Sequence, residues 1–535
     1  MTNGAATTQA PGETDRQILC RVHCREFRVS IDLAALSEVF GGLREASILG
    51  GNIAKGDADG FSYWAAEPRD VFEFRSGQKE PFAKLDRILS KYRLREVDGV
   101  DSRLRGNDKP GPGASWSHGV GVDSRPFGFA PEGLPSGQAL RGNGKSGNIL
   151  PKGMFCGGWI GYFSYELGRY IEKLPAATVD DLAMPLIRLC FYDRFVAYDH
   201  RGGTFRVMAL ELPGDRERPG EKLAGLERLL DEAVTIDVPE PAAADLDNID
   251  LSRFGCNMNR AYYLRTFGKI KRHIFDGDVY QINFSQRFES DYTAEAIDLF
   301  HWQNHYNPSG YSAYIGGPDF KIVSASPEMF MTINDRFIST KPIKGTRRRL
   351  CPADAKAERT NEENFGDLLS SEKERAELNM IVDLERNDLA RICKPGTRHV
   401  SQTRTIETYP TVFHAVATVA GQLRDEITFC DCLKAMFPGG SITGAPKIRS
   451  MEIIDQTEPT TRGVYTGSIG YIGLDGNVCL NIAIRTIIIA GQKAYAQTGG
   501  GIVADSDPES EWNETITKAR ALLAGINSVQ REYSV

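Results

Sequence analysis

Strict alternation of apolar and polar residues in the second half of the chain restricts the fold more than any other feature. In the segment GDVYQINFSQRF (277–288), apolar Tyr280, Ile282 and Phe284 alternate with polar Gln281 and Asn283. Strands of a parallel sheet, covered by helices on both faces, read instead as continuous apolar runs. Because such alternating strands are mixed with helical patterns in irregular order, the sequence predicts an α+β fold with large antiparallel sheets.

The chain of 535 residues is long enough for one large domain or two closely packed ones. Residues 1–16 read as a disordered polar tail, and a Pro/Ala/Asp-rich stretch near 238–250 reads as a linker. We therefore expect an N-terminal domain over 17–250 and a catalytic domain over 251–535. Inside the first, residues 98–150 are rich in Gly and Pro without periodicity, which predicts an inserted loop that takes no part in catalysis.

Charge and composition exclude several classes of function. A net charge of −7 provides no basic surface for nucleic acid or for an anionic membrane. The first residues lack a signal-peptide pattern, and no stretch approaches the roughly 18 apolar residues of a spanning helix. Ten cysteines without a CxxC pair are compatible with reduced thiols. We expect a cytoplasmic protein with a small-molecule partner.

The helical segment SEKERAELNMIVDLERNDLARI (371–392) carries a carboxylate on its apolar side. Glu377 shares a stripe with Met380, Ile381 and Leu384, at spacings of three, four and seven residues. Burying a carboxylate there is costly unless a cation or several donors meet it. The alternative is that Glu377 lies at the solvated edge of the helix, as most glutamates do.

A second acidic site lies at the start of the last helix. Ser506 and Glu509 have capping-box spacing, and Pro508 fits the first turn, so a helix is predicted to begin there. Glu511 and Glu514 then lie on its first two turns. Carboxylates are ligands that Mg²⁺ prefers, usually one or two of them together with waters and substrate oxygens. The alternative is an ordinary capped helix start facing solvent.

Three consecutive glycines, Gly499, Gly500 and Gly501, precede this helix. A glycine run between a strand and a helix allows backbone N–H groups to converge on an anion. The alternative is a flexible hinge.

Four other residues stand out, each with an ordinary alternative. Arg485 interrupts an apolar strand and needs a planar acceptor, either a ligand carboxylate or a structural Asp. Lys344, in KPIKGTRRR, would become nucleophilic if desolvated, although most lysines are solvated. His414 would by default be a core histidine and Glu328 a turn residue.

Seven motifs, taken in order, resemble the chorismate-utilising enzymes, and among them the component I subunits of aminodeoxychorismate synthases. The similarity is strong over about 255–530 and weaker in the N-terminal half, through GGWIGYFSYELGRYIE. It implies an anthranilate-synthase-like fold, with antiparallel sheets forming a sandwich core covered by helices. The motifs are GDVYQINFSQRF, SASPEMF, KPIKGT, RAELNMIVDLERND, FPGGSITGAPKIRSMEIID, GSIGYI and GGGIVADS with EWNET.

The resemblance implies a metal site and a substrate site. Glu377 and Glu514 would hold Mg²⁺, with Glu511 acting nearby through water, and the metal would anchor the ring carboxylate of chorismate. Arg485, Tyr465 and the amides of the three glycines would take the enolpyruvyl carboxylate. Thr443 is also among the substrate-binding residues that the resemblance implies.

The resemblance also implies a reaction. The amine of Lys344 would attack ring carbon C2 with loss of the 4-hydroxyl, and ammonia would then add at C4 and expel the lysine. Glu328 would protonate the leaving hydroxyl and accept a proton from the incoming amine. Gln281 stands where water-using relatives carry a lysine base, which fits ammonia as the nucleophile. His414 matches a histidine near the reacting ring.

Ammonia must be supplied from elsewhere, because the chain has no GxCxG nucleophile elbow of a glutaminase. A separate glutamine amidotransferase subunit, forming a heterodimer, is the implied partner. The nearest alternative function is that of anthranilate synthase component I, which generally has alanine in place of Lys344. A non-catalytic relative that only binds a glutaminase is an alternative of another class.

Overall fold

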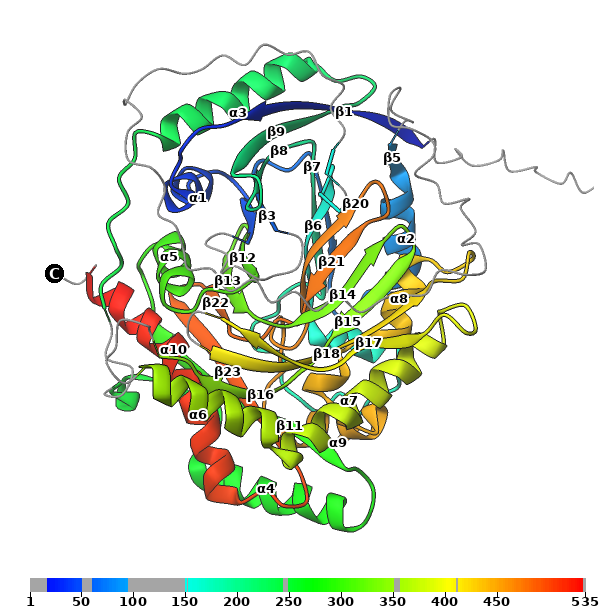
Figure 1. Ribbon diagram of the computed structural model, residues 1–535, viewed down its shortest axis with the longest axis vertical. Helices are drawn as coiled ribbons and strands as arrows, with labels where there is room; N and C mark the ends of the chain where they lie inside the picture. The colour runs from blue at the N-terminus through cyan, green and yellow to red at the C-terminus, as the bar shows by residue number, and fades with distance from the viewer. Residues whose placement is uncertain are drawn as a thin grey trace, which may run out of the picture.

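Two large β-sheets face each other in the computed structural model, which describes residues 17–50, 60–94, 150–151, 153–243, 249–350, 357–409 and 412–532 (Figure 1). Among these residues, one sheet has 13 strands and the other has 10. Every pairing between the named strands is antiparallel except that of β1 with β5. The predicted α+β fold with large antiparallel sheets is therefore confirmed.

The order of strands in the first sheet is β10 (Gly255–Cys256), β11 (Gln281–Asp291), β23 (Lys493–Ile502), β22 (Thr486–Ala490), β13 (Phe320–Ser326), β12 (Tyr311–Gly316), β2 (Ser47–Leu49), β3 (Phe61–Ala65), β8 (Arg194–Asp199), β9 (Thr204–Glu211), β1 (Ile18–Phe27) and β5 (Tyr92–Leu94), with β19 (Gly444–Ala445) beside β11. The order in the second sheet is β16 (Ile343–Arg348), β18 (Val412–Gln422), β15 (Phe337–Lys341), β14 (Met329–Asn334), β21 (Val478–Asn481), β20 (Ser468–Gly473), β6 (Gly158–Phe163), β7 (Ile187–Tyr192) and β4 (Asp70–Phe74), with β17 (His399–Thr408) beside β18.

Aromatic side chains fill the space between the sheets. Tyr63 of β3 and Tyr471 of β20 meet edge to face, with ring centroids 5.7 Å apart, although they belong to different sheets. Phe155 lies against both rings. Burying such large apolar rings between two sheets is what holds a sandwich together.

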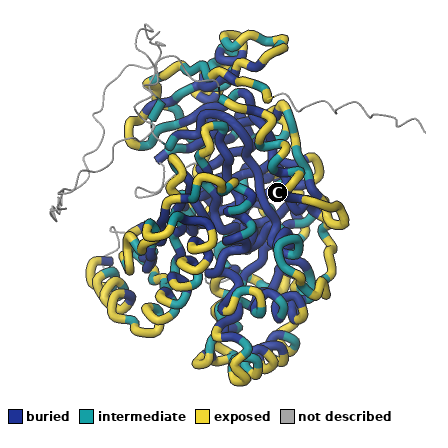
Figure 2. The backbone as a smooth tube through the Cα atoms, turned by 90° about the vertical axis from the view of Figure 1, so that its right-hand side faces the viewer, coloured by how far each residue is buried: buried dark blue, intermediate teal, exposed yellow. Residues whose placement is uncertain are grey.

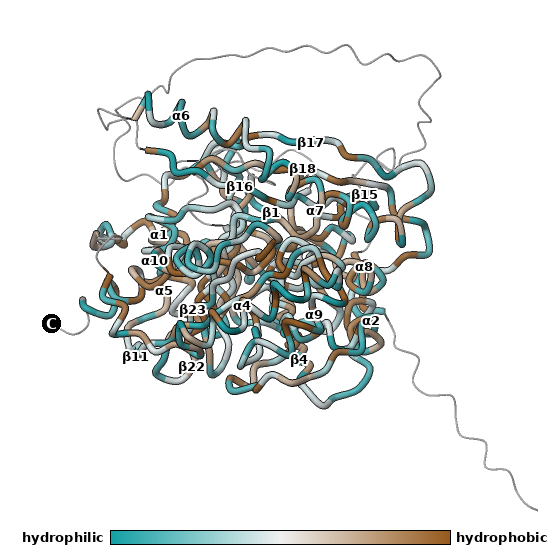
Figure 3. Tube along the Cα trace, turned by 90° about the horizontal axis from the view of Figure 1, so that it is seen from below, coloured by the Kyte–Doolittle hydropathy of each residue, from teal (hydrophilic) through white to brown (hydrophobic). Residues whose placement is uncertain are grey.

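Helices cover the outer faces and ends of the sheets. Figure 2 shows buried residues running through the strands and exposed residues gathering on the helices around them, and Figure 3 shows α6 and β17 together at one margin. The helices are α1 (Leu33–Gly41), α2 (Pro81–Lys91), α3 (Pro219–Ala233), α4 (Arg260–Phe275), α5 (Ala296–Tyr306), α6 (Ala357–Ser370), α7 (Glu372–Ala390), α8 (Phe429–Met436), α9 (Lys447–Thr457) and α10 (Pro508–Glu532), with short 3₁₀ turns η2 (Tyr165–Tyr170), η3 (Leu251–Arg253) and η4 (Gly440–Ile442).

Segments from both halves of the chain share each sheet. Strands β2 and β3 continue the first sheet beyond β12, and β6 pairs with β20 in the second. The boundary near residue 250 stays a prediction. The tail 1–16 and all of the 98–150 insertion except residue 150 lie outside the described residues. Within the described part of the chain, no helix has the length and apolar character needed to cross a bilayer.

Two local predictions can be compared directly with the structure. Helix α4 begins after Asn259, whose side chain accepts a hydrogen bond from the backbone N–H of Tyr262 at 2.8 Å, as predicted. Strand β11 also forms where the alternation predicts it. The polar side chains of Gln281, Ser285 and Arg287 are nevertheless buried, at 1%, 0% and 5% exposure, and that of Asn283 is half-buried. The polar face of β11 therefore looks into the protein interior and not toward solvent.

Candidate functional site

Lys344 lies on β16, where the register with β18 shifts over residues 343–346. A bulge of this kind redirects side chains, and Gly345 beside it has φ +95°, a conformation that favours glycine. The half-buried Lys344 donates a hydrogen bond from Nζ to the carbonyl oxygen of Ser441 at 3.1 Å. Burial lowers the pKa of Lys344, while the carboxylates of Glu328 and Glu377 oppose the shift.

Glu328 connects β13 to β14 and is only 4% exposed. Its carboxyl group bonds the side chain of Ser441, whose carbonyl receives Lys344, and its Oε1 has no partner among the described residues. Burial raises the pKa of Glu328, against the effects of Ser441 and Lys344. The structure thus places a buried, readily protonated carboxyl group beside a partly desolvated amine. Glu328 does lie in a connection between strands, as the default expectation of a turn residue has it, but its side chain is buried.

Glu377 of α7 and Glu514 of α10 lie close enough to Lys344 for each to affect its pKa. Burial raises the pKa of Glu377, and Glu514 adds to that shift. For Glu514, burial acts in the same direction, but Lys518, Lys373 and Lys344 together lower its pKa below the ordinary value. Two helices distant in sequence therefore direct carboxylates toward one amine.

Glu511 is the third predicted carboxylate, and only one of its two oxygens has a partner among the described residues. Its Oε1 accepts a hydrogen bond from the Ser506 hydroxyl at 2.6 Å, while its Oε2 is buried without a partner among the described residues. Burial raises its pKa. The predicted capping box of Ser506 and Glu509 is wrong: Asp507 caps the helix, since its Oδ1 accepts from Ser510 N at 2.9 Å. The Ser506 hydroxyl orients Glu511 instead.

The three glycines at 499–501 end strand β23 and do not form a loop, so the predicted glycine loop between strand and helix is wrong. They pair with 283–285 of β11. Glycine is required there by close approach: a Cβ on Gly500 would lie 2.9 Å from Glu511 Oε2, and one on Gly501 would lie 2.2 Å from Gln281 Nε2. The missing side chains make room for Glu511 and Gln281.

Arg485 has a guanidinium group without an ion pair or side-chain hydrogen bond to any described residue. The structural Arg–Asp pair, the ordinary alternative for this residue, is therefore not observed. Burial lowers its pKa, and its φ of +49° is unusual for a residue other than glycine. An unpaired, half-buried guanidinium held by a strained backbone is suited to receiving a carboxylate from a ligand.

His414 is near Arg485 and is 2% exposed. Its Nδ1 shares a hydrogen bond of 2.8 Å with the Thr346 hydroxyl. Burial, together with the positive charges of Arg485 and Lys341, lowers the pKa of His414 to about 3. The imidazole is therefore neutral at physiological pH.

The remaining predicted residues, Gln281, Thr443 and Tyr465, are all buried, at 1%, 0% and 5% exposure. Gln281 begins β11, and its Oε1 has no partner among the described residues. The Thr443 hydroxyl donates to the carbonyl of Gly439 at 3.0 Å, and burial raises the pKa of Tyr465.

Sequence reasoning missed Ser441 and Lys518. Ser441 belongs to FPGGSITG, and it receives Lys344 through its backbone carbonyl, a group that every residue has and that no sequence pattern marks. Lys518 lies four residues after Glu514, a spacing that predicts an ion pair on a helix. Its Nζ lies 2.7 Å from Glu514 Oε1 and donates to Gly499 O at 3.2 Å.

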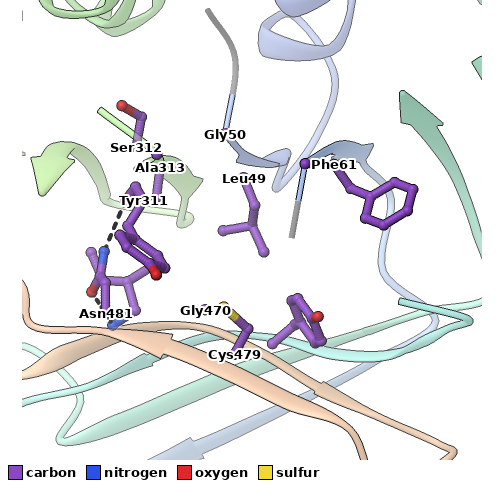
Figure 4. A pocket seen from close by; sticks show the side chains of 13 residues that line it. Leu49, Gly50, Phe61, Tyr311, Ser312, Ala313, Gly470, Cys479 and Asn481 are labelled. Atoms are coloured by element: carbon purple, nitrogen blue, oxygen red, sulfur yellow. Dashed lines mark hydrogen bonds between the residues drawn. The ribbon is translucent and has the colours of Figure 1, made fainter. Parts of the chain in front are cut away.

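In the part of the molecule that the structure describes, the predicted site is neither a preformed metal centre nor part of the pocket between the sheets. Among the described residues, no three His, Cys, Asp or Glu side chains converge as a self-sufficient metal site. A pocket between the sheets contains none of the predicted site residues (Figure 4). Its walls include Leu49, Phe61, Tyr311 and Asn481, and Asn481 Nδ2 donates to Tyr311 O at 3.0 Å.

Comparison with known proteins reveals clear relatives. Residues 124–524 match the family model described as chorismate binding enzyme. The chain is 37% identical over 384 residues to aminodeoxychorismate synthase component 1 of Bacillus subtilis (strain 168), covering 71% of this chain and 79% of the relative. It is 39% identical over 386 residues to anthranilate synthase component 1 of Pseudomonas putida, covering 70% and 76%.

A solved structure agrees with the fold. The crystal structure of anthranilate synthase component I from Streptococcus pneumoniae TIGR4 superposes with a TM-score of 0.66 at 27% identity. The match covers 88% of this chain and 94% of that one. The predicted anthranilate-synthase-like fold is confirmed.

Proposed function

This chain belongs to the family of chorismate-binding enzymes, and we propose that within the family it is the chorismate-aminating component of an aminodeoxychorismate synthase. It replaces the C4 hydroxyl of chorismate by an amino group, giving 4-amino-4-deoxychorismate for p-aminobenzoate and folate synthesis. One observation carries the proposal: the Lys344 amine and the Glu328 carboxyl group meet at Ser441, within the electrostatic reach of Glu377.

Lys344 acts as the nucleophile. Because burial lowers its pKa, a larger fraction of the side chain is the neutral amine, which has the lone pair needed for attack. The nitrogen bonds ring carbon C2, the conjugated ring double bonds shift, and the C4–O bond breaks. Ammonia then bonds C4, the double bonds shift back, and the C2–N bond breaks to release Lys344.

Glu328 moves the protons. Its raised pKa favours the protonated form, which can give a proton to the departing C4 hydroxyl so that it leaves as water. The resulting carboxylate takes a proton from the ammonia nitrogen after it bonds C4. His414 is neutral and bonded to the Thr346 hydroxyl, so it contributes polarity beside the ring without adding charge.

Charged groups of the chain match the two carboxylates of chorismate. Arg485, which has no acidic partner among the described residues, takes the enolpyruvyl carboxylate together with Tyr465. Glu377 and Glu514 are suited to Mg²⁺, with Glu511 nearby, since the Glu514 carboxylate raises the pKa of both Glu377 and Glu511 and a shared cation would offset that repulsion. When bound there, Mg²⁺ would supply positive charge for the ring carboxylate of chorismate.

Ammonia comes from a separate glutamine amidotransferase subunit. The "component 1" in the names of the relatives fits an enzyme with a second subunit. Gln281, buried with an unpartnered Oε1, offers an acceptor to an N–H of incoming ammonia.

Anthranilate synthesis is the rival function, because relatives with that name are as similar as the one named aminodeoxychorismate synthase. Both reactions begin at C2. Lys344 separates them: a lysine that occupies C2 leaves C4 for ammonia, whereas an alanine at that position leaves C2 free.

The test is a product assay by mass spectrometry, with purified protein, chorismate, Mg²⁺ and ammonium and with no lyase added. We expect 4-amino-4-deoxychorismate from the natural protein. The Lys344→Ala variant should lose that product or release anthranilate. Anthranilate as the main product of the natural protein would refute the proposal, and no chorismate turnover, alone or with a glutaminase, would favour a binding role.

A further inference from the structure

A buried ion pair, Arg462 with Glu458, bonds backbone segments next to the site and has no role in the reaction described above. Both side chains are 1% exposed. The pair is bidentate, with Arg462 Nε donating to Glu458 Oε2 at 2.8 Å and Nη2 to Oε1 at 2.7 Å. Burying two charges costs desolvation energy that their attraction often does not recover. Stability alone therefore does not explain why the pair is there.

We infer that Arg462 is a positioning residue for chorismate turnover. Its guanidinium ties together the three backbone segments that carry Gln281, Ser441 and Tyr465. This role rests on the proposed function, because that function is what assigns Gln281, Ser441 and Tyr465 to the site.

All the donors of the guanidinium are engaged. Beyond the two bonds to Glu458, Arg462 donates from Nη1 to Ile442 O at 3.1 Å and to the Thr466 hydroxyl at 3.3 Å. It donates from Nη2 to Asn283 O at 2.7 Å. Five N–H donors in a rigid plane meet five bonds, so a movement of any of these segments would break a bond.

Two of the acceptors adjoin residues that contact the nucleophile or bind the substrate. Ile442 stands between Ser441, whose carbonyl receives the Lys344 amine, and Thr443. Thr466 directly follows Tyr465, and its hydroxyl also donates to the Tyr465 carbonyl at 2.6 Å.

The third contact fixes strand β11. Asn283 O, which accepts from Arg462, is two residues along from Gln281. Glu458 adds to the anchorage, since its Oε1 accepts from the backbone N–H of Ser285 at 2.9 Å and from the Ser285 hydroxyl at 2.7 Å. The ion pair thus secures the strand from which Gln281 projects.

The N-terminal half of the chain supports the guanidinium. The ring of Tyr165 in η2 lies 4.7 Å from the Arg462 guanidinium carbon. Glu166 accepts from the backbone N–H of Arg462 at 2.7 Å and of Gly463 at 2.9 Å. These two residues belong to the SYELGRY stretch, which has no other role in the site. The positioning therefore depends on both halves of the chain.

The first test replaces the whole pair by Arg462→Met with Glu458→Met. Replacing both members of a buried ion pair by apolar residues is often neutral for stability, so the double variant should fold. Without the bonds to the three segments, we expect chorismate turnover to fall by about tenfold to a hundredfold. A folded double variant with turnover within about twofold of the natural protein would overturn the inference.

The second test, Arg462→Lys, keeps the positive charge opposite Glu458. A lysine has three donors on one nitrogen and cannot bridge all the acceptors of a guanidinium fork. We expect the same direction of change in kcat, measured at a temperature where the variant is folded. Turnover equal to that of the natural protein would contradict the positioning role, whatever the double variant does.

Lys222 provides the matched control. It is also a buried cation, 1% exposed, with Nζ 2.6 Å from Asp193 and 2.8 Å from Asp215, but it bonds no residue of the site. Lys222→Met should lower the unfolding midpoint and leave kcat unchanged while the protein is folded. A loss of kcat equal to that of Arg462→Lys would mean that any buried cation has the same effect, which would also contradict the inference.

Two measurements test the inference whichever product the enzyme forms from chorismate. Chorismate consumption, and the rise of the unfolding midpoint when chorismate is added, are followed for every variant. Anthranilate as the product of the natural protein would refute the proposed function and leave the comparison between variants intact. If the natural protein bound chorismate without turnover, an unchanged chorismate-dependent midpoint shift in Arg462→Lys would overturn the positioning role.

Discussion

At the scale of single residues, the carboxyl group of Glu328 and the amine of Lys344 are linked through Ser441. In a solvent-exposed position, both the carboxyl group and the amine would be charged near neutral pH. Burial favours the neutral form of both, which is the pair of protonation states that the first displacement needs.

Replacing Glu328 by Gln should therefore reduce kcat by about two to four orders of magnitude, because the amide cannot give its proton to the leaving hydroxyl. Chorismate should still bind, since Gln keeps the shape of the side chain. Steady-state kinetics with a direct binding measurement checks this. A variant with unchanged kcat would assign the proton transfer to another group.

The low pKa of His414 predicts how the free energy of unfolding depends on pH. Its pKa is about 3 in the folded protein and near 6.5 ordinarily, so between these values the unfolded chain binds a proton that the folded protein does not. Stability is then fully present above about pH 6.5 and falls as the pH is lowered toward 3, by up to about 1.4 kcal/mol per pH unit.

Denaturant unfolding at a series of pH values measures this slope. His414→Asn should flatten it, whereas His399→Asn, at an exposed histidine, should leave it unchanged. Equal slopes in the natural protein and in His414→Asn would contradict the assignment.

At the scale of elements, strands β11 and β23 and helix α10 bring the site together. The glycine end of β23 leaves room for Glu511 on α10. Overpacking at such a position costs about 1–3 kcal/mol or forces the neighbouring carboxylate to move.

Gly500→Ala should therefore displace Glu511 and weaken binding of Mg²⁺. Thermal unfolding with increasing Mg²⁺ gives the apparent affinity without relying on activity. Gly268→Ala on α4 is the control, since a Cβ there meets nothing within 4 Å. Equal Mg²⁺ responses in both variants would count against a metal site next to Gly500.

The start of a helix could be predicted from the sequence where it depends on residues close to it in the chain. The Asn259 cap depends on neighbours within a few residues, and so does the start of α10. The strand character of 499–501 depends instead on pairing with β11, more than 200 residues away. The buried polar face of β11 and the unpaired state of Arg485 likewise follow from tertiary packing, which no local pattern encodes.

At the scale of the whole molecule, both sheets are built from distant parts of the chain. Strand β2 is hydrogen-bonded between β12 and β3, and β6 between β20 and β7. Separating the chain near residue 250 would leave β12 and β20 with open edges that invite aggregation.

We therefore expect residues 249–535, produced alone, to aggregate or to unfold without a cooperative transition. Production together with residues 17–243 should restore both the transition and chorismate binding. Circular dichroism during heating, with and without chorismate, compares the unfolding transition and its shift on binding in the two samples. A sharp transition in 249–535 alone would show that the second half is an independent folding unit.

The most direct test of the account is the mass of the peptide containing Lys344 after the protein is incubated with chorismate and Mg²⁺ without ammonia. We predict a mass increase equal to chorismate minus one water on that peptide, lost when ammonium is added. The contradicting result is an unmodified Lys344 peptide from protein that still converts chorismate to 4-amino-4-deoxychorismate once ammonium is supplied. Lys344 would then not be the nucleophile.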